Sequence, residues 1–259
     1  MLVFYHKHIH LHLEQVTKRT FYLVVVKRTL DIFFFDISPK EVGGQMMKKL
    51  VLYGAGGLAR EIVYMVERIN RVCPSYELLG FVVDKEYYVP GMSVNGYPIV
   101  GNGDWLVAHK DEVVCTCAVG EPPTARERIQ ETYESLGIKF ETLISPDVEM
   151  HESVKIGSGC VICWRTTFTV DVEIGKGTFI NGRNAFGHDS VVGKYCSIYS
   201  DCSINGHVKI GDRVKIGGKS YFCPKVRVGD DAVVAAGSVV FTKVKAGRHV
   251  FGNPAKRID

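Results

Sequence analysis

The sequence predicts a chain of two parts, in which a small α/β domain is followed by an all-β solenoid of short parallel strands. Two observations lead to this prediction. A glycine-rich turn follows an apolar strand near residue 54 and opens a helix. An apolar residue then recurs at every sixth position from residue 144 to residue 240. The first pattern is typical of nucleotide-binding α/β domains, and the second is typical of β-solenoids.

The first 46 residues differ in character from the rest of the chain. They carry alternating histidines, namely His6, His8, His10 and His12. One interpretation is a strand that binds a metal with four histidines on one face. The interpretation we favour is an extension translated from an upstream start codon, because Met46-Met47 and two lysines precede an apolar strand as a natural start would. We therefore hypothesise that residues 1–46 are an extension that does not belong to the native protein.

Residues 48–142 are predicted to form a small Rossmann-like domain. Gly54, Gly56 and Ala59 satisfy the dinucleotide fingerprint, and Gly57 extends the turn before an apolar-faced helix. Such glycines allow a phosphate to approach the helix N-terminus. A second strand ends at Asp84, an acid suited to binding ribose hydroxyls, although it lies 30 residues after Gly54 rather than the usual spacing of about 20. A structural domain without a ligand remains an alternative.

The remaining elements of this domain follow in order. A strand is expected over residues 113–119, a helix over 123–137 with a glycine stop, and a last short strand over 140–143. These elements make one half of a dinucleotide-binding fold, which is small for holding NAD.

Residues 144–245 carry the six-residue repeat. With 46% of the chain apolar, seventeen consecutive matches arise by chance about once in a million. The repeated residues are Ile144, Met150, Ile156, Ile162, Phe168, Ile174, Ile180, Phe186, Val192, Ile198, Ile204, Ile210, Ile216, Phe222, Val228, Val234 and Val240. Three hexads close one triangular coil, so residues eighteen apart occupy the same corner of adjacent coils, about 4.8 Å apart. Residues 246–259 form a closing segment.

The small residue four positions after each repeated one is also expected to point inward. Cys160, Cys196 and Cys202 occupy such positions, which makes them core residues rather than zinc ligands. We expect no metal site. A β-solenoid can also carry a zinc carbonic anhydrase site, but the histidine pair five residues apart that such a site uses is missing from His151 onward.

Composition excludes several classes of partner. The net charge is +4 and no lysine or arginine run is present, so nucleic acid is not expected to bind. Charged residues interrupt the apolar stretches near the N-terminus, which predicts no membrane span. Eight cysteines without a signal-peptide pattern suggest free thiols in the cytoplasm.

From Lys48 to Asp259 the chain resembles the bacterial sialic acid O-acetyltransferase and UDP-4-amino-sugar N-acetyltransferase family of surface-glycan biosynthesis. The resemblance rests on the glycine turn at 54–57, the hexads, the pair His188-Asp189, and the closing Gly-Asn-Pro-Ala-Lys at 252–256. It implies a nucleotide-sugar-binding N-terminal domain, a left-handed parallel β-helix, a homotrimer, and acetyl-CoA bound in grooves between neighbouring prisms.

The resemblance also implies roles for individual residues. His188 matches the catalytic histidine, Asp189 its acidic neighbour, and Asn181 a position near the acceptor sugar. The family's second histidine, at the CoA end, is replaced here by Ser197. Late coils would contact CoA, with small residues beside the pantetheine arm and a lysine near the phosphates. These positions are Gly218, Ala236, Gly237, Asn253, Pro254 and Lys256.

Chemical reasoning supports the same centre. A histidine can remove a proton from an attacking amine or hydroxyl at neutral pH, and Asp189 would hold the imidazole in the required tautomer. Gly206 lies eighteen residues after His188, at the same corner one coil along. Its N–H, uncovered by a side chain, is a candidate donor to the acetyl carbonyl of bound acetyl-CoA.

Three functions remain open at this point. The first is N-acetylation of a nucleotide-activated amino sugar, and the second is O-acetylation of sialic acid or another sugar. The third, from another class, is an NAD-binding or nucleotide-sensing protein in which the β-helix is only a trimer stem.

Overall fold

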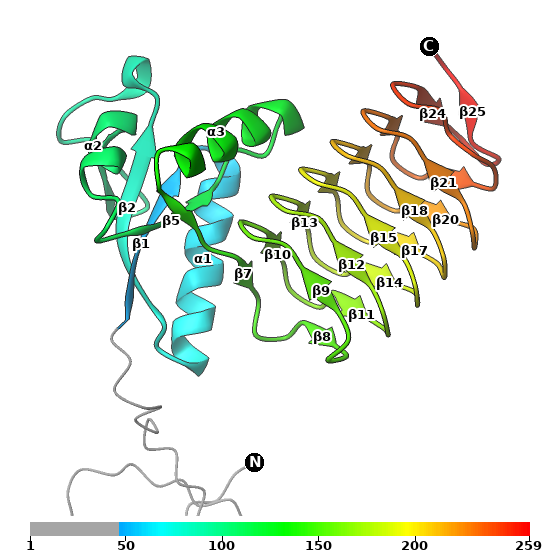
Figure 1. Cartoon of the computed structure of the whole chain (residues 1–259), viewed down its shortest axis with the longest axis horizontal. Coiled ribbons are helices and arrows are strands. Elements are labelled where there is room, and N and C mark those ends of the chain that lie inside the picture. The colour runs from blue at the N-terminus through cyan, green and yellow to red at the C-terminus, as the bar shows by residue number, and fades with distance from the viewer. Residues whose placement is uncertain (1–46) are drawn as a thin grey trace, which may run out of the picture. The chain divides into compact units, whose positions relative to one another are not determined.

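The computed structural model describes residues 47–259 (Figure 1), which cluster as one compact unit. The alternating histidines and the predicted extension lie outside these described residues. None of the helices within 47–259 has the length and apolar character needed to cross a membrane.

An α/β domain opens the described chain. Its elements are β1 (Lys48–Tyr53), α1 (Gly57–Val72), β2 (Tyr76–Val83), the 3-10 turn η1 (Lys85–Tyr87), β3 (Ser93–Val94), β4 (Tyr97–Asn102), α2 (Gly103–Ala108), β5 (Val114–Cys117), α3 (Pro123–Ser135) and β6 (Lys139–Phe140). The sheet order is β3-β4-β2-β1-β5-β6, with all pairs parallel except β3 and β4. This order confirms the Rossmann-like prediction and places a topological switch point between β1 and β5.

The elements β3, β4 and α2 were not predicted from the sequence. The strand predicted over 113–119 and the helix predicted over 123–137 are both shorter in the structure, as β5 and α3. Short elements such as these carry too few residues for a periodic pattern, and element ends are set by local contacts.

The hexads form a triangular prism with three faces. The first face contains β7 (Leu143–Ile144), β10 (Val161–Ile162), β13 (Phe179–Ile180), β16 (Ser197–Ile198), β19 (Lys215–Ile216), β22 (Val233–Val234), β24 (His249–Phe251) and β25 (Lys256–Arg257). The second face contains β8 (Glu149–Met150), β11 (Thr167–Phe168), β14 (Ala185–Phe186), β17 (Ser203–Ile204), β20 (Tyr221–Phe222) and β23 (Val239–Val240). The third face contains β9 (Lys155–Ile156), β12 (Glu173–Ile174), β15 (Val191–Val192), β18 (Lys209–Ile210) and β21 (Arg227–Val228).

The register confirms the eighteen-residue coil. Ile162 pairs with Ile180, and Phe168 pairs with Phe186, whose ring stacks on it at a centroid distance of 4.7 Å. The repeated residue of each middle coil is buried, and so is the small residue four positions later. The parallel two-residue strands and these repeats are consistent with the left-handed β-helix that the resemblance implies.

Three corners join the faces, and each is a short turn. In one coil the first corner is residues 181–184, the second is 187–190 and the third is 193–196. The same turns recur every eighteen residues. At the second corner, Asp171, Asp189, His207 and Lys225 all have positive φ, between 56° and 66°. Equivalent turn residues therefore stack above one another along the prism.

The prism ends with a shortened coil. Val234 pairs with Val250, sixteen residues later, and Val228 forms a bridge with Val244. The coil after Val240 is therefore two residues shorter than the regular eighteen-residue coil. β25 then turns back and pairs antiparallel with β24.

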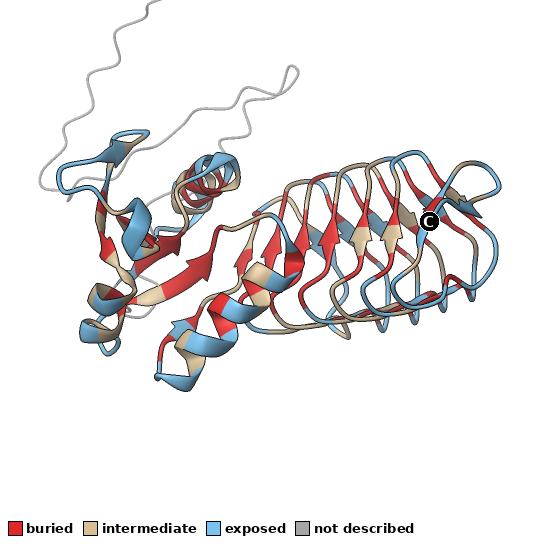
Figure 2. Ribbon diagram, turned by 90° about the horizontal axis from the view of Figure 1, so that it is seen from above, coloured by how far each residue is buried: buried red, intermediate tan, exposed pale blue. Residues whose placement is uncertain are grey.

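The α/β domain covers the start of the first face. Leu143, Val161 and Phe179, which would point outward from that face, are buried together with Ile62 and Met65 of α1. Figure 2 shows buried positions both on α1, which is seen nearly end-on, and on the first strands of the prism. The first face therefore carries the domain, and the second corner is the corner that joins the other two faces.

Candidate functional site

A pocket opens at the switch point of the α/β sheet. Its volume is about 600 Å³. It is lined by the ends of β1 and β2, the glycine turn, the segment after β5 and one side of α3. The predicted ligand-binding residues Gly54, Gly56, Gly57 and Asp84 all line it, as does Arg128. Ligands of parallel α/β sheets bind at this place, beyond the carboxyl ends of the strands.

The glycine turn is open to this pocket. Gly54 has φ of +108°, and a Cβ there would meet Val119 and the Ala118 carbonyl at 3.1–3.3 Å. A Cβ at Gly56 would meet nothing within 4 Å. Gly56 precedes the sixteen-residue helix α1, whose first turn holds no acidic residue. The free N–H groups at this helix end favour an anion such as phosphate.

Asp84 is held in place by a tyrosine. The Tyr53 hydroxyl donates a hydrogen bond of 2.5 Å to Asp84 Oδ1 and lies 3.2 Å from the Tyr133 hydroxyl. Burial, followed by the bond to Asp84, raises the pKa of Tyr53 well above its usual range. Tyr53 therefore stays protonated, and the carboxylate keeps acceptor positions for a ligand hydroxyl.

His188, Asp189 and Gly206 meet at the second corner. The ring N–H at His188 Nδ1 donates to Asp189 Oδ2 over 2.8 Å, and this bond holds the pKa of Asp189 below its usual range. A Cβ on Gly206 would lie 2.6 Å from His188 Nε2. Among the hydrogen bonds of residues 47–259, none uses the Gly206 N–H. A basic nitrogen and a free amide therefore lie side by side on the surface.

The structure adds His207 to this group. Its ring meets the His188 ring edge-on, with centroids 5.0 Å apart, and its Nδ1 lies 3.8 Å from Asp189 Oδ2. No role was assigned to His207 from the sequence. The eighteen-residue spacing from Asp189 to His207 would have predicted the contact. The ligand atoms of His188, Asp189 and His207 lie within 4.8 Å of one another, which a metal ion could bridge.

Most of the other predicted contacts stack along the first corner. Asn181 is half-buried, and its side-chain oxygen accepts the Gly182 N–H. Gly218, Ala236 and Gly237 recur in the same turn two and three coils later. Gly237 has φ of +72°, and a Cβ there would meet nothing within 4 Å. Asn253 and Pro254 follow β24 at the same corner, and Lys256 opens β25.

Within one chain, the second face separates these residues from His188. Asn181 precedes β14 and His188 follows it, so the two residues lie at opposite ends of that strand. The α/β domain, which holds the pocket, contacts the first face through α1 and the third corner through α3. His188 lies at the second corner. Within one chain, His188, the predicted CoA contacts and the nucleotide pocket therefore lie on separate surfaces.

Ser197 does not fit its predicted place at the CoA end. It lies on the outward side of β16, but its exposed fraction is 0%. Its hydroxyl accepts from Arg126 Nη2 at 3.0 Å and lies 3.4 Å from the Gly120 carbonyl. The α/β domain covers this side of the prism, so Ser197 is unavailable to CoA on its own chain.

Two regions of the chain match known families. Residues 49–133 match the PglD N-terminal domain, and residues 207–242 match the bacterial transferase hexapeptide repeat. Together with the fold, these two matches confirm the resemblance stated from the sequence: the chain is similar to hexapeptide-repeat transferases and to proteins with a PglD N-terminal domain. No curated protein sequence gives a significant match.

Three solved structures are similar to this chain over nearly their whole length. One is the perosamine N-acetyltransferase of Caulobacter crescentus, solved as a histidine-to-asparagine mutant with CoA and GDP-perosamine (TM-score 0.71, 24% identity, 83% of this chain and 98% of that one). WeeI from Acinetobacter baumannii AYE has a TM-score of 0.70 and 26% identity over 82% of this chain and 100% of that one. The acetyltransferase domain of PglB from Neisseria gonorrhoeae FA1090 has a TM-score of 0.63 and 24% identity over the same shares.

Proposed function

We propose that the protein transfers an acetyl group from acetyl-CoA to the amine of a nucleotide-activated amino sugar, with His188 as the general base. The observation that carries the proposal is the second corner, where His188 is hydrogen-bonded to Asp189 and its ring lies against Gly206, whose N–H makes no hydrogen bond within residues 47–259. The pocket at the glycine turn supplies a place for the nucleotide. The complexes of the relatives with CoA and GDP-perosamine support the same pair of substrates.

The proposed reaction follows from these groups. The sugar amine attacks the thioester carbonyl, and His188 Nε2 accepts the proton that the amine loses. Asp189 holds the ring with Nδ1 protonated and stabilises the imidazolium. The Gly206 N–H donates to the carbonyl oxygen as negative charge develops there. When the tetrahedral intermediate collapses, the carbon–sulfur bond breaks and the imidazolium returns the proton to the CoA thiolate.

We further propose that the working site forms between copies in a homotrimer. In one chain, His188 lies at the second corner and the predicted CoA contacts lie at the first, so a neighbouring copy must bring the two together. The outward residues of the second face support this arrangement, because most are uncharged. They are Glu149, Thr167, Ala185, Ser203, Tyr221 and Val239. The third face instead presents charged residues at all but one outward position, which suit solvent; its outward residues are Lys155, Glu173, Val191, Lys209 and Arg227.

The CoA contacts proposed are those of the first corner, with Lys256 beside the phosphates and Ser197 left out. Nucleotide sugars and acetyl-CoA are both made in the cytoplasm, which is where we place the reaction. We propose that Asn181 lies near the acceptor sugar whose amine is deprotonated by His188 of a neighbouring copy.

The test is an acetyl-transfer assay with a panel of acceptors. The protein is mixed with acetyl-CoA and with UDP-, GDP- and dTDP-linked amino sugars, free amino sugars, or sialic acid, and thiol release is followed. We expect release only with nucleotide-linked amino sugars, and no effect of a chelator on the rate. Release with sialic acid would favour O-acetylation. The absence of release with any acceptor, together with tight NADH binding, would favour the nucleotide-sensing alternative.

A further inference from the structure

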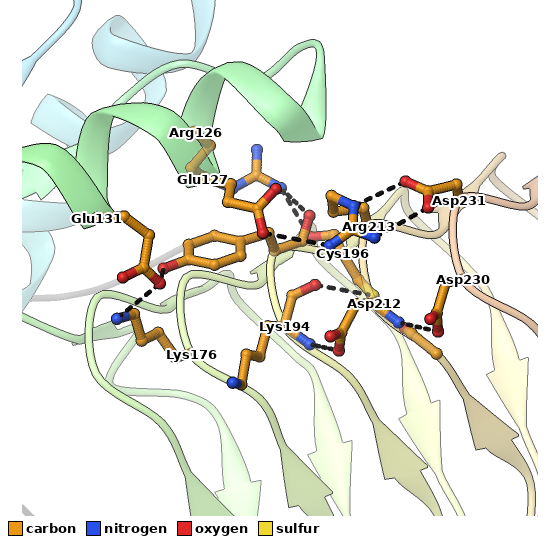
Figure 3. Close-up of polar contacts among 12 residues, drawn as sticks. Arg126, Glu127, Glu131, Lys176, Lys194, Cys196, Asp212, Arg213, Asp230 and Asp231 are labelled. Atoms are coloured by element: carbon orange, nitrogen blue, oxygen red, sulfur yellow. Dashed lines mark hydrogen bonds and ion pairs between the residues drawn. The ribbon is translucent and has the colours of Figure 1, made fainter.

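Arg126 is the largest side chain buried in the described residues, with an exposed fraction of 1%. It lies on α3, at the contact between the α/β domain and the prism (Figure 3). Its guanidinium makes six hydrogen bonds, five of them to backbone carbonyls. Among the ion pairs within residues 47–259, none includes Arg126. Its charge is therefore solvated by dipoles rather than neutralised by an acid.

The partners of Arg126 fall into two groups. Nη1 donates to the carbonyls of Val119 at 3.1 Å and Gly120 at 3.0 Å. Nε donates to Gly177 O at 2.7 Å, and Nη2 donates to Tyr195 O and Cys196 O at 2.9 Å each. Nη2 also reaches the Ser197 hydroxyl. One planar group thus joins the segment after β5 to two successive coils of the prism.

The first group of partners belongs to the nucleotide pocket. Val119 and Gly120 both line it. Val119 also lies against the glycine turn, since a Cβ on Gly54 would be only 3.1 Å from Val119 Cγ2. Val119 and Gly120 thus form one wall of the pocket. The position of this wall therefore decides how a ligand fits between the segment after β5 and the N-terminus of α1.

We propose that Arg126 is a positioning residue of the nucleotide pocket, which fixes the Val119–Gly120 wall to the prism and thereby sets the affinity for the nucleotide. This inference rests on the proposed function for the identity of the ligand. Arg126 does not line the pocket, so it acts through the wall.

A general role in attaching the domain does not account for this geometry. Arg213 of the prism already links to α3 through an ion pair with Glu127 at 3.2 Å, and it also pairs with Asp231 of the next coil at 2.7 Å (Figure 3). Attachment alone would be served as well by apolar residues, because burying an unpaired guanidinium carries a desolvation cost. What Arg126 adds is a fork of five N–H donors that reaches the wall and both coils at once.

The experiment compares Arg126→Lys with Arg213→Gln. Lysine keeps the charge but lacks the planar fork, so the wall loses part of its support. Arg213→Gln weakens attachment of α3 without touching the pocket wall, and it is the matched control. UDP and GDP binding are measured by calorimetry, and KM is measured for the nucleotide sugar and for acetyl-CoA. Folding and assembly of each variant are checked by circular dichroism and sedimentation.

We expect Arg126→Lys to weaken nucleotide binding and raise the nucleotide-sugar KM by about tenfold or more, with the acetyl-CoA KM changed by less than about twofold. Arg213→Gln should leave both KM values within about twofold. Equal changes in both KM values of Arg126→Lys, or equal nucleotide-sugar effects in the two variants, would overturn the proposal.

Hydrogen exchange of the wild-type protein provides a measurement that does not depend on a variant folding. Adding the nucleotide should protect the peptide that covers residues 117–121 and leave the peptide around 211–213 unchanged. No protection at 117–121 would remove the wall from the binding site. If nucleotide binding depends on Arg126 but the protein transfers no acetyl group to any acceptor, the proposed function is contradicted and the role of Arg126 still stands.

Discussion

At the residue scale, the chemistry of the second corner depends on the stacking of turns one coil apart. The imidazole of His188 lies over Gly206, and its Nδ1 faces the neighbouring Asp189. We expect His188→Ala to lower kcat by about 10²–10⁴-fold, because the amine loses its proton acceptor. His151→Ala, an exposed histidine at the same corner two coils earlier, should leave kcat unchanged. Steady-state kinetics with sedimentation to confirm assembly checks both, and near-normal turnover of His188→Ala would exclude it from the mechanism.

Gly206 offers a second test at this scale. A methyl group there would lie 2.6 Å from His188 Nε2, well inside van der Waals contact, so the imidazole must move. We expect Gly206→Ala to lower kcat by about tenfold or more while folding is retained. A crystal structure of the variant should show the ring displaced. Unchanged kcat with a displaced ring would contradict the proposed geometry of proton transfer.

Most of this centre could be predicted from the sequence, because the eighteen-residue spacing maps residue numbers onto corners. Gly206 was predicted in this way, whereas His188 and Asp189 were predicted from the family resemblance. His207 obeys the same spacing and was overlooked, since a lone exposed histidine is usually without a role. Ser197 and Arg126 could not be placed, because their surroundings depend on how α3 packs against the prism. No periodic pattern within one element records such a contact.

At the element scale, ion pairs between successive turns of the third corner join neighbouring coils of the prism, as Arg213 and Asp231 do at 2.7 Å. The hydrogen bonds from Arg213 hold the pKa of Asp231 below its usual range. A depressed folded-state pKa stabilises the folded protein above the unfolded value of about 4, and this gain is lost as the pH falls through the folded value. The contribution should stay below about 1 kcal/mol because both groups are partly exposed.

The corresponding prediction concerns Asp231→Asn. At pH 7 the variant should unfold at a slightly lower temperature than the wild type, because Arg213 loses a charged partner. The difference should shrink as the pH falls below about 4, where the wild-type carboxylate also becomes protonated. Thermal unfolding at pH 7 and pH 3 measures this. A difference that grows in acid would show that Asp231 acts through some other contact.

The elements themselves differ in how well the sequence predicts them. The helix α1 and all seventeen hexad strands follow from periodicity, since the apolar residues of each are spaced to face one core. β3 and α2 are too short for that. The outward apolar residues Leu143, Val161 and Phe179 did signal that something covers the first face, but the alternation of a hexad strand gives no indication of what.

At the scale of the whole molecule, the proposed site requires two copies. We therefore expect two inactive variants to complement each other. His188→Ala removes the base at the second corner, and Ala236→Trp places a large side chain on the exposed first corner where CoA is proposed to lie. If each site combines corners from neighbouring copies, an equal mixture of subunits regains about one quarter of the wild-type sites, and the mixed trimers within it regain about one third.

Co-expression with two different affinity tags and kinetics of the doubly purified complex test this prediction. Each variant alone should retain less than about one hundredth of wild-type kcat/KM. Activity of the mixed complex no greater than the sum of the two variants would place the whole site within a single chain. The control is a mixture of His188→Ala with wild type, which should lose activity in proportion to the share of variant subunits.

The antiparallel strand β25 has a further consequence for assembly. A column of parallel strands ends in a row of unpaired backbone groups, which invites a second column to add on end to end. By folding back over β24, residues 256–257 occupy that row on the first face and point the chain away from the axis. Without this terminal fold, stacking of columns into filaments would compete with the closed assembly.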